Sequence, residues 1–330
     1  MLPLSAYLSN ASGFLNVSLA TEGFLLPVTF FYIYTMKRNL PLCLLLLMVA
    51  TSYSCRDTLD TNYKKEISDW RETRIERLKS KTGWLNLAGI FWLEEGENSF
   101  GSDSSNSIVF PPSAASFYGS ILKTGDSILL KPSSNPEITV NGQVSGETLL
   151  VSDDSGNPSL MESGSIAWYI IKREDRYAIR LRDYNHPRIA ALDSIPCYET
   201  SGKWRVVADF IPFDTLRQVE TTTATGRVDL SNCPGELVFR IGFKKYTLLP
   251  FLEGDELFII VADKTNGIET YGNGRFMYAA LPDSLNKVIL DFNKAYNPPC
   301  ALTPFANCPM PPRENILDLK IEAGEKEVHL

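Results

Sequence analysis

From Trp84 onward, the chain consists of short apolar runs separated by turn-forming residues. The turn signals include Asn141-Gly142, Asp154-Ser-Gly156 and Asp263-Lys-Thr-Asn266-Gly267. Helical periodicity is nearly absent from this part of the chain. Strand-length runs that recur about every 8–12 residues are typical of antiparallel sandwiches and barrels, and not of alternating strands and helices. The sequence therefore predicts a mainly β protein made of antiparallel sheets.

The length of this region predicts two packed β units, because it exceeds one typical domain. We expect the first unit, within residues 66–190, to be a sandwich, and the second, residues 191–330, to be a sandwich or an open barrel. The runs expected to form strands are 85–93, 108–110, 127–131, 137–140, 148–152, 166–172 and 177–181 in the first unit. In the second they are 197–211, 217–223, 226–230, 235–243, 245–249, 256–262, 275–280, 288–292 and 316–321.

One amphipathic helix is expected before the strands. Ile67, Trp70, Arg74, Ile75 and Leu78 fall at helical spacing among charged residues. We expect this helix, over residues 67–78, to pack on one end of a β unit. Residues 55–65 are polar and are predicted to form a tether ahead of it.

The beginning of the chain carries the pattern of an export signal. Met36-Lys-Arg-Asn is followed by the apolar run 40–50 and then by Ser52-Tyr-Ser-Cys55. A basic start, an apolar core and small residues before a cleavage point make a secretory signal. Because the small residues end at a cysteine, the segment resembles a bacterial lipobox, with Cys55 as the lipidated first residue. The sequence predicts residues 1–35 as an over-long start, 36–54 as a lipoprotein signal peptide, and a protein in the cell envelope, anchored to a membrane and facing the periplasm or the surface.

Charge and histidine content exclude several classes of function. Removing residues 1–54 takes away Glu22, Lys37 and Arg38, a net charge of +1, so the remaining chain goes from −7 to −8. This acidity argues against nucleic acid as a partner. With His186 and His329 as its two histidines, the chain has no set of three for a zinc site and little material for a Ser–His–Asp triad. We predict no metal and no cofactor.

Four cysteines remain after the signal and the lipidated residue: Cys197, Cys233, Cys300 and Cys308. An even number in an exported chain suggests disulfides, with three possible connectivities. The pair Cys300–Cys308 is the most local, and closing its loop would stabilise the fold by about 2.6 kcal/mol in the chain-entropy model. A nucleophilic Cys300 is the alternative, but it would need a neighbouring base.

Polar side chains gather near the C-terminus, where an apolar strand enters a proline-stiffened loop at residues 288–300. Arginine, tyrosine and asparagine beside apolar strands suit a sugar, a small polar ligand or a carboxylate. Carboxylates of the same cluster, with Glu269, could instead supply acid–base chemistry. Each of two carboxylates also has a structural alternative to a role in a site. Asp263 could cap a turn, and Asp291 could form an ion pair with Arg275. The candidate ligand-binding residues are Asp263, Tyr271, Arg275, Asp291, Asn293, Tyr296, Asn297 and Glu314.

Two family resemblances can be read from the motifs. The run Gly96-x-Asn-x-Phe-Gly-Ser-Asp103-x-x-Asn106, followed by Val140-Asn-Gly, resembles forkhead-associated domains, which bind phosphothreonine through loop Arg and Ser residues. Here Ser102 stands where that Arg is expected, so phosphopeptide binding is not carried over.

The second resemblance covers about residues 70–326. Its motifs are Gly83-Trp-Leu-x-Leu-x-Gly-Ile-Phe-Trp-Leu, Asn98-x-Phe-Gly-Ser-Asp103, Asp263-Lys-Thr-Asn-Gly-x-Glu-Thr-Tyr-Gly-x-Gly-Arg275, Leu290-Asp-Phe-Asn-Lys-Ala-Tyr-Asn-Pro-Pro-Cys300, and Cys308-Pro-Met-Pro-Pro-x-Glu-Asn315 through Ala323-Gly-Glu325. They resemble the bacterial domain of unknown function numbered 1684. The resemblance implies one family-wide unit and points to the C-terminal loop, without naming a ligand.

Three functions remain compatible with the sequence. The first is a lipid-anchored protein that binds a small polar or carbohydrate-like ligand around residues 291–300. The second is a hydrolase that uses carboxylates of the cluster, which would require a pair about 5–9 Å apart in a cleft. The third is a structural protein of the cell envelope, with a filled loop and no concavity. For the first, we expect Arg275, Tyr296 and Asn297 to face one cavity, with Asp291 beside Arg275.

Overall fold

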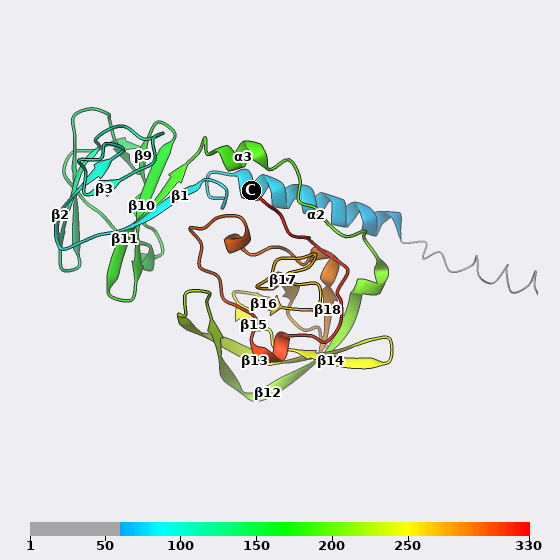
Figure 1. The fold of residues 1–330 in the computed structure, drawn as a ribbon. Helices are drawn as coiled ribbons and strands as arrows, with labels where there is room; N and C mark the ends of the chain where they lie inside the picture. The colour runs from blue at the N-terminus through cyan, green and yellow to red at the C-terminus, as the bar shows by residue number, and fades with distance from the viewer. Residues whose placement is uncertain (1–59) are drawn as a thin grey trace, which may run out of the picture. The chain divides into compact units, whose positions relative to one another are not determined.

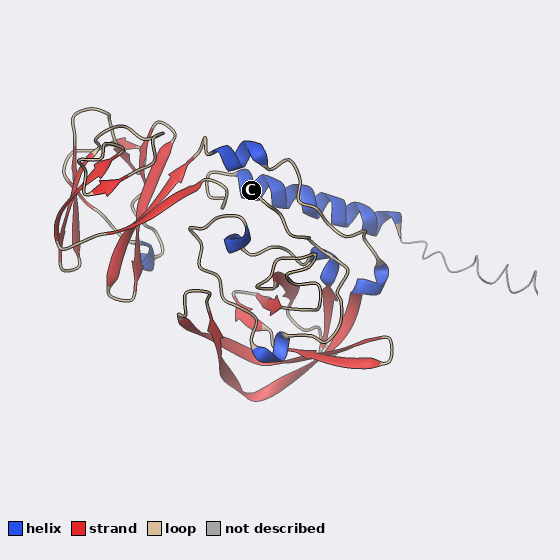
Figure 2. Cartoon of the chain, in the orientation of Figure 1, coloured by secondary structure: helices blue, strands red, loops and turns tan. Residues whose placement is uncertain are grey.

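Strands dominate the computed structural model, which describes residues 60–330 (Figure 1). They form four sheets, and α2 (Thr61–Lys79) is the one long helix of this part of the chain (Figure 2). The predicted class, mainly β with antiparallel units and one N-terminal helix, is confirmed. The predicted signal peptide and the lipidated Cys55 lie outside the described residues. Within residues 60–330, no helix is both long and apolar enough to cross a membrane.

The N-terminal β unit contains two sheets around one core. The six-stranded sheet has the order β1 (Leu87–Trp92), β11 (Arg176–Asp183), β10 (Ile166–Arg173), β9 (Met161–Ser163), β6 (Thr139–Val140), β7 (Gln143–Val144). The five-stranded sheet has the order β3 (Ile108–Val109), β2 (Gly96–Gly101), β4 (Gly119–Thr124), β5 (Ser127–Pro132), β8 (Thr148–Leu149). Neighbours are antiparallel except β2 and β3.

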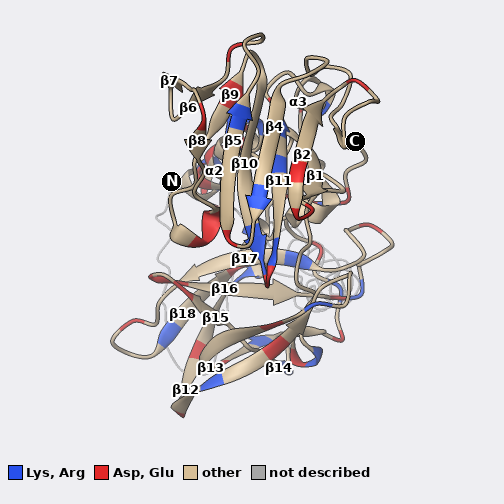
Figure 3. Ribbon diagram, turned by 90° about the vertical axis from the view of Figure 1, so that its left-hand side faces the viewer, with Lys and Arg blue, Asp and Glu red and all other residues tan. Residues whose placement is uncertain are grey.

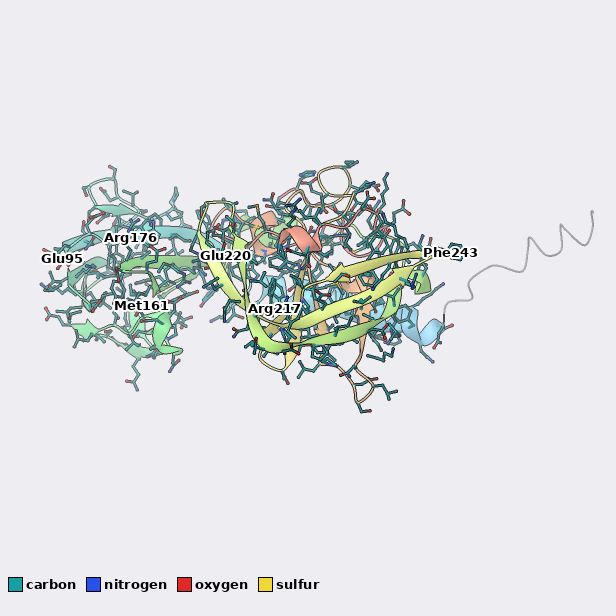
Figure 4. All side chains as sticks on the ribbon, turned by 90° about the horizontal axis from the view of Figure 1, so that it is seen from below. Glu95, Met161, Arg176, Arg217, Glu220 and Phe243 are labelled. Atoms are coloured by element: carbon teal, nitrogen blue, oxygen red, sulfur yellow. The ribbon has the colours of Figure 1, made fainter. Side chains whose placement is uncertain are left out.

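Aromatic rings from both sheets fill the core of this unit. Trp168 of β10 contacts Phe100 of β2 and Tyr118, with ring centroids 5.5 and 5.1 Å apart, and all three side chains are buried. Met161, at the start of β9, belongs to the same core (Figure 4). Since residues of two sheets share one apolar core, this unit is the expected sandwich.

The C-terminal β unit also packs two sheets on a common core. A four-stranded sheet has the order β14 (Lys244–Leu248), β13 (Val228–Ile241), β12 (Arg205–Thr222), β18 (Lys287–Asp291). A three-stranded sheet has the order β15 (Phe251–Glu253), β16 (Glu256–Val261), β17 (Arg275–Ala280). Leu237 of β13, Ile259 of β16 and Met277 of β17 are fully buried members of that core.

Two expected strands merge in β12. The run 197–211 enters β12 only from Arg205 onward, and there it forms one strand with the run 217–223. The pairing of this strand with β13 shifts register between Pro212 and Arg217. Proline cannot donate to the ladder, so an irregularity at this point is expected. Arg217 and Glu220 lie on the outer part of the resulting ribbon (Figure 4).

The last expected strand, 316–321, does not form. Ile316 makes an isolated bridge with Ala262, and the segment is otherwise irregular. Its backbone bonds do not form a regular ladder: the Leu317 N–H donates to the Ala262 carbonyl at 2.8 Å, the Lys264 N–H donates to the Leu319 carbonyl at 2.8 Å, and the Ile321 N–H donates to the side chain of Asp263 at 3.1 Å.

Helix α2 begins earlier than expected and contacts the C-terminal β unit. Asp60 caps its start by accepting from the Asn62 N–H at 3.0 Å, so residues 61–65 of the predicted tether are helical. Its buried side chains are Tyr63, Ile67 and Leu78. The remaining short helices are α3 (Pro187–Ala191) and the single-turn segments η1 (Asp153–Ser155), η2 (Gly202–Trp204), η3 (Phe292–Lys294), η4 (Pro299–Ala301) and η5 (Arg313–Asn315).

Candidate functional site

The structure divides the predicted polar cluster into separate groups. Arg275 and Asp263 form one buried ion pair, Asp291 and Asn293 contact the start of α2, and Tyr296 and Asn297 line a groove beside the end of α2. Tyr271 lies near the Cys300 thiol. Glu314, in η5, is exposed and lines none of these features.

Arg275 holds the C-terminal segment to β17 and does not face a cavity. Its guanidinium is 0% exposed and donates to Asp263 Oδ2 at 2.7 Å, to the Ile321 carbonyl at 3.0 Å and to the Ala323 carbonyl. The Asp263 carboxylate also accepts from the backbone N–H and the hydroxyl of Thr265. The expectation that Arg275 lines a binding cavity is therefore wrong, because every neighbour it reaches belongs to the protein's own interior.

Asp291 pairs with the first turn of α2 instead of with Arg275. The Tyr63 hydroxyl lies 2.8 and 2.9 Å from its two carboxylate oxygens, and Asn293 donates to the Tyr63 hydroxyl at 2.9 Å. Burial, and then the adjacent Asp291, raise the pKa of Tyr63 well above its usual range. The expected Asp291–Arg275 contact is thus replaced by a neutral phenol that donates to the carboxylate.

Arg74 connects the middle of α2 to the loop after β18. It forms an ion pair with Glu325 and donates to the Asn297 carbonyl at 2.9 Å, and its guanidinium lies 4.3 Å from the centroid of the Tyr296 ring. The same Glu325 accepts from the Asn297 N–H at 2.7 Å. Gly324, just before it, has φ +75°, and a Cβ there would lie 2.4 Å from the Ala295 carbonyl oxygen. A glycine is needed because the two segments approach this closely.

Two adjoining cavities lie along α2, with volumes of about 520 and 530 Å³. Both are lined by Arg74, Arg77, Tyr278 and Tyr296, so they form one groove between the helix and β17. The first also reaches Asn297 and the apolar residues Phe258, Phe276 and Leu302, and the second reaches Trp70, Arg205, Glu256 and Asp291. We call this feature the α2 groove; each cavity has the size of a small-molecule site.

Two stacked tyrosines form the wall of the α2 groove. The rings of Tyr278 and Tyr296 have centroids 6.4 Å apart at an interplanar angle of 14°, and Phe276 packs edge-on against Tyr296. The Tyr278 hydroxyl donates to Glu253 at 3.0 Å. Burial raises the pKa of both tyrosines, so they stay neutral through the physiological range.

Arg77 brings an unpaired positive group to the α2 groove. Lys, Arg, Asp and Glu are interspersed over the strands (Figure 3), so this group is a feature of one residue and not of a general excess of positive charge. Arg77 is exposed, and its guanidinium makes no hydrogen bond or ion pair within residues 60–330. Among those residues, no group of His, Cys, Asp and Glu could hold a metal ion.

Cys300 and Cys308 lie side by side, without a bond between their sulfurs. The Cys300 N–H donates to Cys308 Sγ at 3.1 Å. A hydrogen bond from the Cys308 thiol lowers the pKa of Cys300 to about 7, against the effect of burial and with support from the Tyr271 hydroxyl. The same pairing raises the pKa of Cys308. The disulfide stays a prediction, and the structure adds that the reduced pair would contain one acidic thiol.

This pair predicts a two-part result with a thiol-alkylating reagent. In unreduced protein we expect neither Cys300 nor Cys308 to react, because the predicted disulfide would join them. After reduction without unfolding, the reaction of Cys300 should reach half its maximal rate near pH 7, since its thiolate forms above its lowered pKa. Mass spectrometry of peptides across a pH series measures both parts. Cys233, whose thiol pKa is raised by burial, is the internal control.

An alkylated Cys300 in the unreduced, folded protein would contradict the disulfide. A Cys300 profile that matches the Cys233 profile would contradict the acidic thiol.

Four residues that build the α2 groove or fix its walls are not among the predicted site residues: Tyr63, Arg77, Tyr278 and Glu325. Tyr63 lies in the predicted tether, and Tyr278 lies in a predicted strand. A signal was available for the contact made by Arg74, because an arginine on the same helical face as Ile67 and Trp70 needs a buried partner. Glu325 ends the last of the family-like motifs, but no local pattern links residues 74 and 325.

The fold and the groove together define a mainly β protein with a helix-bordered groove on its C-terminal unit. Residues 190–326 match the model of a family described as "Protein of unknown function (DUF1684)". This match supports that family for the C-terminal part of the chain, a shorter span than the motifs suggested.

Two solved structures are similar to parts of the chain. An uncharacterized protein of Haloarcula marismortui has 29% identity, with 42% of this chain and 78% of that chain covered, and a TM-score of 0.36. A chain from a study of phosphothreonine-dependent FHA domain interactions has 17% identity, with 28% and 92% covered, and a TM-score of 0.21. No curated protein matches the sequence.

Proposed function

We propose that this protein binds a small polar, carbohydrate-like ligand in the α2 groove. The observation that carries the proposal is a groove of two adjoining cavities whose shared wall is a pair of stacked tyrosines with two arginines at its edge. Sugar rings carry C–H groups on their faces and hydroxyls around their rims. A wall of aromatic faces with polar groups at its margin matches both features.

The position of the groove supports binding over a purely structural role. Arg74 and Glu325 fix one side of the groove, and Tyr63 with Asp291 fixes the helix at its other end. Walls that are already ordered lose little conformational entropy when a ligand binds.

A hydrolase that uses the predicted carboxylates has less support. Asp263 is fully buried against Arg275, and Asp291 accepts from Tyr63 and Asn293. General acid–base work needs a carboxyl group that can reach the substrate and exchange a proton with it. The protein itself occupies these two carboxylates, and the other two candidates, Glu269 and Glu314, line neither cavity of the groove. Binding without chemistry is therefore the better-supported function.

We further propose that the protein works in the cell envelope, held to a membrane by a lipid on Cys55. The support is the sequence of residues 36–55, with its basic start, apolar run and terminal cysteine. Labelled fatty acid should be incorporated into the wild-type protein and not into Cys55→Ser; label on the variant would contradict the anchor.

Tyr278→Ala is the substitution that tests the binding proposal. Tyr278 is 38% exposed, so its removal should leave the fold intact while it takes away half of the stacked wall. Aromatic stacking contributes about 0.5–1.5 kcal/mol, so affinity for a bound oligosaccharide should fall about 2- to 10-fold. Titration calorimetry with maltotetraose and tetragalacturonate measures the change.

Phe243→Ala is the matched control. Phe243 is a fully exposed aromatic residue at the turn between β13 and β14 (Figure 4) and lines neither cavity of the groove. Binding should be unchanged in this variant. Absence of glycan binding by the wild-type protein, or equal losses in the two variants, would contradict the proposal.

A further inference from the structure

Arg77 is a charged group in the α2 groove that the fold does not use. It follows Arg74 by three residues, so both guanidinium groups lie on the same side of the helix. Arg74 is paired with Glu325 and Asn297, whereas Arg77 lines both cavities, is exposed and has no partner within residues 60–330. An arginine without a partner at the wall of a cavity provides a fork of donors for an anion.

The charged groups that line the two cavities are balanced in number. Arg74, Arg77, Arg205 and Lys294 stand against Glu66, Glu253, Glu256 and Asp291. Lys294 pairs with Glu66, and the tyrosines Tyr278 and Tyr63 donate to Glu253 and Asp291. The attraction for an anion therefore comes from Arg77 itself, whose guanidinium has no partner within residues 60–330, and not from a net positive charge of the groove.

Asn297 supplies a second unused group at the same wall. It is 0% exposed and lines the first cavity. Its amide nitrogen donates to the Lys326 carbonyl at 2.7 Å, and its backbone N–H donates to Glu325. Its side-chain oxygen is buried and accepts no hydrogen bond in the structure. A buried acceptor without a donor is costly, and a ligand hydroxyl would satisfy it.

We propose that the ligand is an acidic carbohydrate. Its anionic group binds Arg77, a hydroxyl donates to Asn297 Oδ1, and a ring face lies on Tyr278 and Tyr296. This inference rests on the proposed carbohydrate-binding function and adds the charge of the ligand. The anion can be the carboxylate of a uronic acid or the phosphate of a sugar phosphate, since a guanidinium binds both in the same way.

The test compares Arg77→Gln with the wild-type protein. Tetragalacturonate, maltotetraose and glucose 6-phosphate are titrated separately into each, and inorganic phosphate is included to detect binding of an anion alone. We expect the wild-type protein to bind an acidic sugar more tightly than maltotetraose, and Arg77→Gln to lose about tenfold or more of that affinity, as for one charge-assisted hydrogen bond. Added salt should weaken the wild-type interaction in the same direction.

Arg240→Gln is the matched control, because Arg240 is an exposed arginine of the same β unit that lines neither cavity. It should bind as the wild type does. Thermal melts of both variants separate loss of contact from loss of fold. If tetragalacturonate binds more tightly than glucose 6-phosphate, the anion is assigned to a carboxylate. If glucose 6-phosphate binds more tightly, the anion is assigned to a phosphate.

Four results would overturn the inference. Maltotetraose binding as tightly as both acidic sugars would leave the groove a carbohydrate site without a preference for charge. An unchanged Arg77→Gln variant, or inorganic phosphate bound as tightly as the acidic sugars, would remove the assigned contacts. If no sugar binds the wild-type protein, the proposed function fails and this inference fails with it.

Discussion

Arg275→Ala is expected to lower the free energy of unfolding by about 3–5 kcal/mol, as removal of one member of a buried ion pair does. Both side chains of the Arg275–Asp263 pair are 0% exposed. The substitution leaves the Asp263 carboxylate buried without its cation, and leaves the carbonyls of Ile321 and Ala323 without their donor. Urea denaturation of the variant and the wild type gives the difference.

A second variant identifies the cause of that loss. The double variant Arg275→Met with Asp263→Asn has no unpaired charge in the interior. It should therefore be more stable than the single variant Arg275→Met. Arg240→Ala, at an exposed arginine of the same unit, should change stability by less than about 1 kcal/mol. If Arg275→Ala also lowers the free energy of unfolding by less than about 1 kcal/mol, the structural role assigned to Arg275 is contradicted.

The same experiment decides between two roles for Arg275. Sequence motifs placed it at the start of a strand after a glycine turn, which suits a ligand-binding residue as well as a structural one. The two cannot be told apart from the sequence, since both require an arginine near a carboxylate. The structure separates them because it places three backbone carbonyls of residues 321–325 around the guanidinium.

Short apolar runs were the part of the fold most easily predicted. The runs 166–172 and 177–181 correspond to β10 and β11, since apolar runs of this length between turn signals are typical of strands. The run 316–321 is also largely apolar and yet forms no strand. Its backbone bonds go to the backbone of Ala262 and Lys264 and to the side chain of Asp263, contacts that no periodicity reveals.

The candidate site was only partly predictable, for a physical reason. Tyr296 and Asn297 were found because prolines and an apolar strand mark their loop. The residues opposite them, Arg74 and Arg77, lie more than two hundred positions earlier in the sequence, on a helix. A groove between segments so far apart depends on tertiary packing, and local sequence patterns contain no information about which distant segments meet.

Glu325→Ala is expected to destabilise the protein by about 3 kcal/mol, since it breaks a mostly buried ion pair and leaves a backbone donor without its acceptor. Glu325 accepts from Arg74 on α2 and from the Asn297 N–H on the loop after β18. Its carboxylate therefore joins both walls of the α2 groove. Urea denaturation measures the loss of stability, and hydrogen exchange of the α2 amides locates it.

The coupling between Arg74 and Glu325 gives a further measure of this contact. In a double-mutant cycle with Arg74→Met and Glu325→Gln, the two substitutions should differ from additivity by about 0.5–3 kcal/mol. Exchange should increase most in the second half of α2, because Tyr63 still holds the first turn to Asp291. Additive effects, or an unchanged exchange rate along the helix, would show that Glu325 does not fix the helix. The groove would then need a ligand, and not this ion pair, to order its walls.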